Sequence, residues 1–73
     1  MTPFITAYII AGDRRVGEIS SNGFSGYTVK ADGAAKSYGF STERHAFSHA
    51  KRVAKRNKVD VSQWKLTLME IRP

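Results

Sequence analysis

The sequence predicts a small α+β domain, in which an antiparallel sheet of four to five strands carries one amphipathic helix packed on one face. Two observations predict this fold class. Short segments rich in β-branched and aromatic residues follow one another, with turn signals between them. One later stretch places small apolar residues three and four positions apart, which is the period of a helix. At 73 residues, the chain is expected to form a single domain over residues 1–73.

Two strands are expected first, with a Gly-Asp turn signal between them. Residues 3–11 (PFITAYIIA) are apolar on both alternating faces, which favours a central strand. Residues 15–20 (RVGEIS) are less apolar and predict a weaker strand at an edge of the sheet. Asn22 and Gly23 then form a tight-turn pair, because both tolerate a positive φ.

The next two strands are expected over residues 27–31 (YTVKA) and 36–40 (KSYGF). The first of them alternates apolar and polar side chains, as a strand with one buried face does. Asp32 and Gly33 lie between the two segments and are a second hairpin signal. A meander of hairpin-connected strands therefore precedes the helix.

The helix is expected to begin after Ser41 or Thr42, either of which can cap its first turn. Glu43 suits the positive end of the helix dipole, and Asn57 is a plausible C-cap. The apolar stripe consists of Ala46, Phe47, Ala50, Val53 and Ala54. The opposite side carries Arg44, Lys51, Arg52, Lys55 and Lys58. Because the stripe is built of small residues around Phe47, the helix can lie close to the sheet.

A last strand is expected over residues 64–71 (WKLTLMEI), after the helix. Trp64, Leu66 and Leu68 fall on one face of this strand. Met69 and Ile71 fall on the other, so a bulge or burial on both faces is expected.

The charge is the most unusual property of the composition. Twelve basic and six acidic residues give a net charge of +6 and a pI near 10.1. Residues 44–58 hold six positive side chains and no negative one, although an ordinary surface helix mixes the two signs. This run is either a solvated face or an electrostatic binding surface for a negatively charged partner. The chain tolerates the repulsion between these like charges, which favours the binding surface. The candidate partner-binding residues are Arg14, Arg15, Arg44, Lys51, Arg52, Lys55, Arg56 and Lys58.

Catalysis is the least expected function. The chain contains no cysteine, no phosphate-binding loop, no nucleophile elbow and no dinucleotide fingerprint. His45 and His49 share one helix face, as zinc ligands do, but no third ligand or HExxH pattern accompanies them. We therefore expect no metal, cofactor or catalytic residue. No apolar run approaches the length of a membrane span, so no membrane association is expected.

The aromatic residues allow two interpretations. Aromatics on a sheet can stack on nucleic-acid bases, but a domain of this size needs most of them for its core. Phe4, Phe40, Phe47 and Trp64 are assigned to the core. Phe24, Tyr27 and Tyr38 remain open between stacking and packing.

Residues 26–56 (GYTVKADGAAKSYGFSTERHAFSHAKRVAKR) resemble the three-strand-plus-helix arrangement of integrase arm-binding and plant AP2-type DNA-binding domains. In those families a hairpin leads through a GF-x-T sequence into the helix, and the sheet enters the major groove. The likeness covers under half of the chain, and these strands carry few arginines. It implies a small basic DNA- or RNA-binding domain.

The whole chain, ending in KLTLMEIRP, resembles small lytic-phage regulators of host RNA polymerase in its length, basic charge and order of elements. This resemblance implies a protein that inhibits host transcription initiation and promotes antitermination. The implied partners are host RNA polymerase, near the N-terminus of its β′ subunit and the RNA exit channel, the elongation factor NusA and nascent RNA. A monomer in the host cytoplasm is expected.

Phage anti-defence proteins of the anti-CRISPR kind share the same small, basic character. They occupy nucleic-acid channels on large complexes, so the same electrostatics would serve them. The sequence leaves this alternative open beside the polymerase regulator and the nucleic-acid-binding domain.

Overall fold

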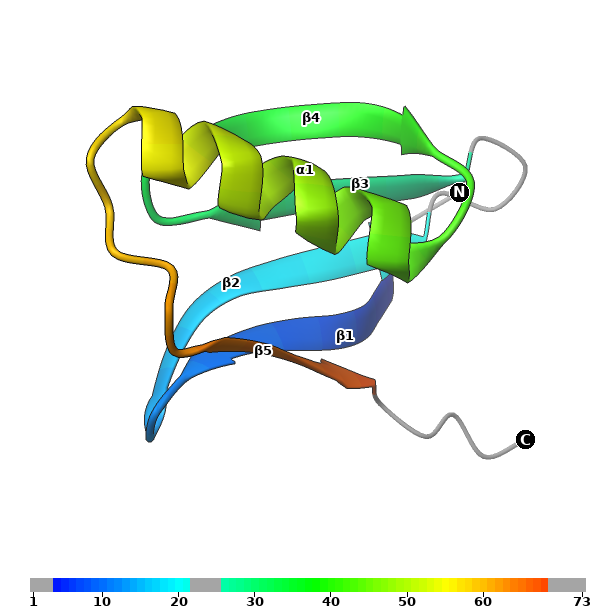
Figure 1. The fold of residues 1–73 in the computed structure, drawn as a ribbon. Helices are drawn as coiled ribbons and strands as arrows, with labels where there is room; N and C mark the ends of the chain where they lie inside the picture. Colours follow the sequence, from blue (N-terminus) through cyan, green and yellow to red (C-terminus); the bar gives the residue numbers. More distant parts are fainter. Residues whose placement is uncertain (1–3, 22–25, 69–73) are drawn as a thin grey trace.

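The computed structural model describes residues 4–21 and 26–68, which form one five-stranded antiparallel sheet with a single helix packed against it (Figure 1). The α+β fold class predicted from the sequence is confirmed. The elements are β1 (Phe4–Ala11), β2 (Arg14–Ser21), β3 (Tyr27–Ala31), β4 (Ala34–Phe40), α1 (Glu43–Arg56) and β5 (Trp64–Leu68).

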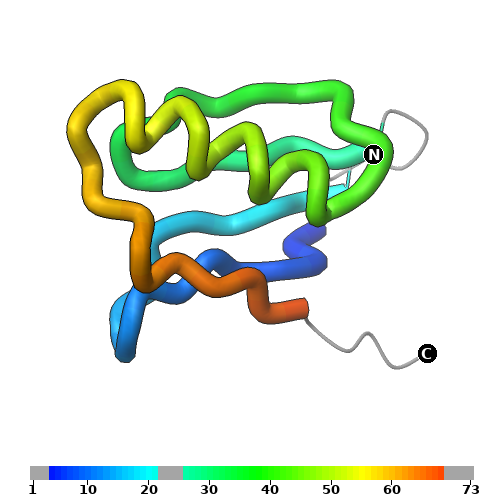
Figure 2. Tube along the Cα trace, in the orientation of Figure 1, coloured from blue at the N-terminus to red at the C-terminus, as the bar shows by residue number. Residues whose placement is uncertain are grey.

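The strands are arranged in the order β4-β3-β2-β1-β5. The first four form a meander, and the segment after α1 passes along one end of the sheet to bring β5 beside β1 (Figure 2). The central position predicted for the first strand is confirmed, because β1 pairs with both β2 and β5. The edge position predicted for residues 15–20 is wrong, because β2 pairs with β1 and β3. Its polar residues reflect an uncovered face of the sheet instead.

Strand pairing places one row of side chains across all five strands. The row runs from Leu68 through Ala7, Ile19 and Val29 to Ser37. Its three central members are buried, and they lie on the face of the sheet that α1 covers. The buried apolar core consists of Ala7, Ile9, Val16, Ile19, Val29, Ala34, Ala46, Ala50, Ala54 and Trp64.

The helix contributes only three alanines to the fully buried core. Because these side chains are short, the helix axis can approach the sheet closely, as the sequence predicts. Phe47 and Val53 lie on the two flanks of the stripe and are half-buried. The core assignment of Phe4 is wrong, because this residue at the start of β1 is 49% exposed.

Both predicted helix ends are found where the sequence places them. Thr42, rather than Ser41, is the N-cap, and its Oγ1 accepts a hydrogen bond of 3.1 Å from the backbone N–H of His45. Asn57 is the C-cap. The Asp-Gly turn between β3 and β4 is also confirmed, with Gly33 at a φ of 75°. The predicted Asn22-Gly23 turn, Phe24 and the Met69 and Ile71 side chains lie outside the described residues.

A candidate electrostatic binding surface

The solvent side of the helix is a basic surface, which we call the outer face of α1. It consists of Arg44, Lys51, Arg52, Lys55 and Arg56 of the helix, with Lys58 just beyond the C-cap. Ala46, Ala50 and Ala54 face the sheet, so the 3.6-residue period directs the five helical cations away from it. All six side chains are exposed except that of Lys51, which is half-buried.

Carboxylates of the described residues leave this charge uncompensated. Glu43, in the first turn, is the single acidic residue of α1. Within residues 4–21 and 26–68, none of the six cations forms an ion pair with a carboxylate. Like charges four residues apart, such as Arg52 and Arg56, repel each other by a few tenths of a kcal/mol. The outer face is therefore free to meet a negatively charged partner.

The two flanks of the helix differ in what lies beneath the cations. On the flank toward β5, Arg44 lines a groove with Phe47, Ser48, Leu66 and Leu68, which we call the β5 groove. The Lys51 ammonium lies 5.2 Å from the centre of the Phe47 ring on this flank. On the flank toward β4, Arg52 lines a second hollow with Phe40, His45 and His49.

Arg14 and Arg15, both candidate partner-binding residues, point to opposite faces of the sheet. Arg14 pairs with Ala11 and lines a hollow that also contains Asp60 and Trp64. The Arg15 guanidinium lies 4.0 Å from the centre of the Tyr8 ring, on the face that α1 leaves uncovered. Only Arg44, Lys51, Arg52, Lys55, Arg56 and Lys58 of the candidate residues therefore share one surface.

The uncovered side of the sheet, which we call the open face, carries a second group of basic and aromatic residues. Tyr8, Glu18 and Lys30 form a row across β1, β2 and β3. On β4, Tyr38 is 68% exposed, with the Lys36 ammonium 5.5 Å from its ring centre. The basic residues of the open face are Arg15, Lys30, Lys36 and Lys65. Tyr38, left open between stacking and packing, is exposed here.

Tyr8 and Lys65 were not singled out from the sequence. Tyr8 belongs to a strand that carries apolar residues on both faces, so the sequence does not show which of its faces is open. Lys65 pairs with Ile10 of β1, and this pairing depends on strand order. The signal that could have found them is the period of two in each strand.

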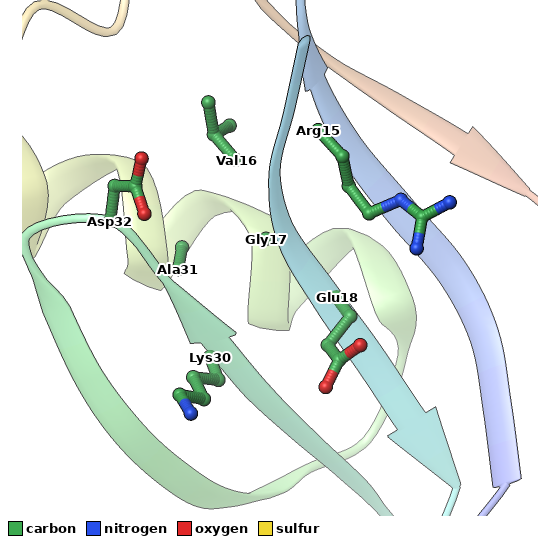
Figure 3. Close-up of a pocket in the computed structure, with 7 residues that line it drawn as sticks. All are labelled: Arg15, Val16, Gly17, Glu18, Lys30, Ala31 and Asp32. Atoms are coloured by element: carbon green, nitrogen blue, oxygen red, sulfur yellow. The ribbon is translucent and has the colours of Figure 1, made fainter.

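A hollow between β2 and β3 on the open face is lined by charges of both signs (Figure 3). Arg15 and Glu18 come from β2, whereas Lys30 and Asp32 come from β3 and its following turn. Gly17 provides the close approach of the two strands there: a Cβ at this position would lie 2.7 Å from the Ala31 Cβ. The described lining of this hollow holds two cations and two carboxylates, so their charges balance.

Each of the two histidines of α1 lies within hydrogen-bond distance of a serine hydroxyl. Nδ1 of His45 lies 3.0 Å from the Ser41 hydroxyl, and Nε2 of His49 lies 3.3 Å from the Ser37 hydroxyl. The His49 ring also contacts Phe40, with 5.0 Å between ring centres. The described residues contain no group of three histidine, cysteine or acidic side chains that could hold a metal ion.

Comparisons with known proteins place no relative beside this chain. No protein-family model, curated protein or solved structure matches it. Within the part of the chain that the structure describes, no helix has the length and apolar character needed to cross a membrane.

Proposed function

We propose that this chain is a non-enzymatic binding protein that contacts a negatively charged partner through the outer face of α1. The observation that carries the proposal is the array of six cations without a carboxylate partner among the described residues. An array of one sign attracts a polyanion over about 8–10 Å at physiological ionic strength and speeds its capture. The exposed cations contribute little to the stability of the fold, so the charge is better explained by a partner.

The resemblance to small lytic-phage regulators gives this proposal its specific form. The partner is then host RNA polymerase near the RNA exit channel, at the N-terminal region of β′, with NusA and nascent RNA close by. A compact basic domain there would contact acidic protein surface and RNA phosphates together. By narrowing the exit path it would hinder a terminator hairpin from forming, and it would act as a monomer in the host cytoplasm.

Capture from a bacterial lysate tests this proposal. Tagged chain is incubated with nuclease-treated lysate at moderate salt, and bound proteins are identified by mass. We expect the polymerase subunits to be recovered by the unaltered chain and lost with the double variant Arg52→Glu/Arg56→Glu. The matched control is Lys30→Glu/Lys36→Glu, which changes the net charge equally but alters the open face.

The outcomes separate the alternatives. Equal loss with both variants would show that net charge, not the outer face of α1, drives capture. Failure of the unaltered chain to retain polymerase core enzyme or holoenzyme would reject host RNA polymerase as the partner. Recovery of another nucleic-acid-handling complex in its place would favour an anti-defence protein.

Direct nucleic-acid binding is the second candidate, and the open face favours it. Two cation–aromatic pairs, Arg15 with Tyr8 and Lys36 with Tyr38, lie on this face. Aromatic rings stack on bases while neighbouring cations contact phosphates. Fluorescent single-stranded and duplex probes, titrated at several salt concentrations, test this candidate. We expect Lys36→Glu/Lys65→Glu to reduce the slope of log affinity against log salt by about 2. An absence of probe binding at low salt would reject it.

A further inference from the structure

The two edges of the sheet differ in how open they are to pairing with another strand. Strand β4 has two breaks in its register against β3, and Gly39 on it has a φ of 85°. Such irregularities bend an edge and discourage further pairing. Strand β5, in contrast, pairs with β1 in unbroken register from Trp64 to Leu68. The regular outer edge is therefore that of β5.

The face of the sheet beside β5 is also incompletely covered. The helix packs mainly on β3 and β4, and Figure 1 shows β1 and β5 lying to one side of it. Leu68 is consequently 60% exposed, although it shares a row with the buried Ala7 and Ile19. Leu66 and Phe47 are half-buried beside it and line the β5 groove. An apolar surface thus continues from the core to the open edge.

The β5 groove is basic where it is polar. Arg44 lines it, and the Lys51 ammonium lies over the ring of Phe47. None of the described residues that line the groove is acidic. Lys65 lies on the same edge strand but points to the open face, because it pairs with Ile10. A strand added at this edge would therefore meet cations on both of its faces.

We propose that the β5 edge binds an extended segment of a partner protein by β-strand addition, and that this segment alternates apolar with acidic residues. Backbone hydrogen bonds to β5 would supply affinity, whereas every second side chain of the partner segment would lie in the β5 groove and supply specificity. The apolar side chains would cover Phe47, Leu66 and Leu68. Because alternate residues of a strand point to opposite faces, the acidic side chains would then lie on the open face, where they would meet Lys65.

Charge complementarity argues for an acidic partner rather than a second copy of this chain. The β5 segment itself reads WKLTL and contains a lysine but no acidic residue. Pairing two copies through β5 would bring like charges together between chains of net charge +6. The β5 groove shares Arg44 and Lys51 with the outer face of α1, but the inference does not rest on the proposed function, because it does not use the outer cations Arg52, Lys55 and Arg56.

A synthetic peptide of ten residues, alternating valine with aspartate or glutamate, tests the inference by NMR titration of the ¹⁵N-labelled chain. We expect chemical-shift changes to concentrate at residues 64–68 and Phe47, with slower hydrogen exchange of β5 amides. Two control peptides are used: one carries lysine at the acidic positions, and the other is N-methylated at alternate backbone nitrogens. Both should bind at least about tenfold more weakly, because the first reverses the charge and the second cannot pair.

Leu68→Asp is the informative variant, because the side chain is exposed and its replacement should leave the fold intact. We expect this change to weaken peptide binding by about tenfold or more. Tyr38→Asp is the matched control: it introduces the same charge at a similarly exposed side chain on the other edge strand and should leave binding unchanged. Shift changes centred on β4, equal weakening by both variants, or no binding of the acidic peptide would overturn the inference. Self-association through β5 that the peptide does not disrupt would also overturn it.

Discussion

The side-chain amide of Asn57 donates a hydrogen bond of 2.7 Å to the carbonyl oxygen of Gly33. This bond joins the C-terminal end of α1 to the turn between β3 and β4. The backbone N–H of Asn57 also closes the last helical turn on the Val53 and Ala54 carbonyls. Asn57 therefore ends the helix and ties its last turn to the turn between β3 and β4.

Replacing Asn57 by alanine should destabilise the fold by about 1 kcal/mol, since a hydrogen bond between helix and sheet is lost at an exposed site. Urea unfolding followed by circular dichroism measures the change. Lys55→Ala, two residues earlier and exposed, is the control and should alter stability by less than about 0.5 kcal/mol. Equal effects of the two variants would show that the Asn57–Gly33 bond contributes nothing.

Gly17→Ala should destabilise the fold by about 1–3 kcal/mol, because the new methyl group would be too close to β3, which β2 approaches closely at this point. Its Cβ would lie 2.7 Å from the Ala31 Cβ and 2.8 Å from the Lys30 carbonyl oxygen. Thermal or urea unfolding gives the value. The double variant Gly17→Ala/Ala31→Gly removes the first contact but not the second, so it should recover part of the loss. No recovery would mean that the backbone contact alone sets the cost.

Arg52→Glu should raise stability slightly while weakening partner binding. The change replaces repulsion between Arg52 and Arg56 by an attractive pair four residues apart, with an expected gain of about 0.5 kcal/mol. The gain should shrink in high salt, since both side chains are exposed. Urea unfolding at two salt concentrations measures it, and polymerase capture measures the binding. Unimpaired capture would identify the outer face of α1 as a solubility surface.

The Asp60 carboxylate should make a small, acid-sensitive contribution to stability. The backbone N–H and the hydroxyl of Ser62 hold the pKa of Asp60 below its ordinary value, and the Ser62 N–H lies 3.0 Å from Oδ1. A lowered folded-state pKa means that the contribution is present above the unfolded-state value of about 3.9 and is lost as the pH falls through the folded value. NMR titration of the carboxyl group gives this pKa directly. Asp60→Asn keeps an acceptor without a titrating group, so this acid sensitivity should disappear.

The helix was the most predictable element of this fold, because its ends are set locally. Thr42 and Asn57 are short-range caps, and the alanine stripe fixes which side faces the sheet. Strand order was not predictable, because it depends on pairing between distant segments. The polar residues of β2 suggested an edge, but an interior strand with one uncovered face has the same composition.

The candidate site likewise combines features that the sequence predicts with features that depend on the tertiary fold. A period of 3.6 residues is enough to gather the five cations of α1 on one surface. Arg14 and Arg15 are adjacent in sequence, but neighbours on a strand point to opposite faces, so they do not form one patch. The groove beside β5 depends on where the helix lies across the sheet. Nothing within the β5 segment alone reveals that Leu68 is left exposed.

The pairing of β1 with β5 has a consequence for the order of events during synthesis. Strand β1 is the most apolar strand, and one of its two neighbours is made only after the helix. Until residues 64–68 leave the ribosome, the edge of β1 has no partner within this sheet. A nascent chain at that stage presents an apolar strand edge to its surroundings, which favours aggregation and contact with chaperones. Late formation of β5 therefore sets the length of time over which the growing chain is vulnerable.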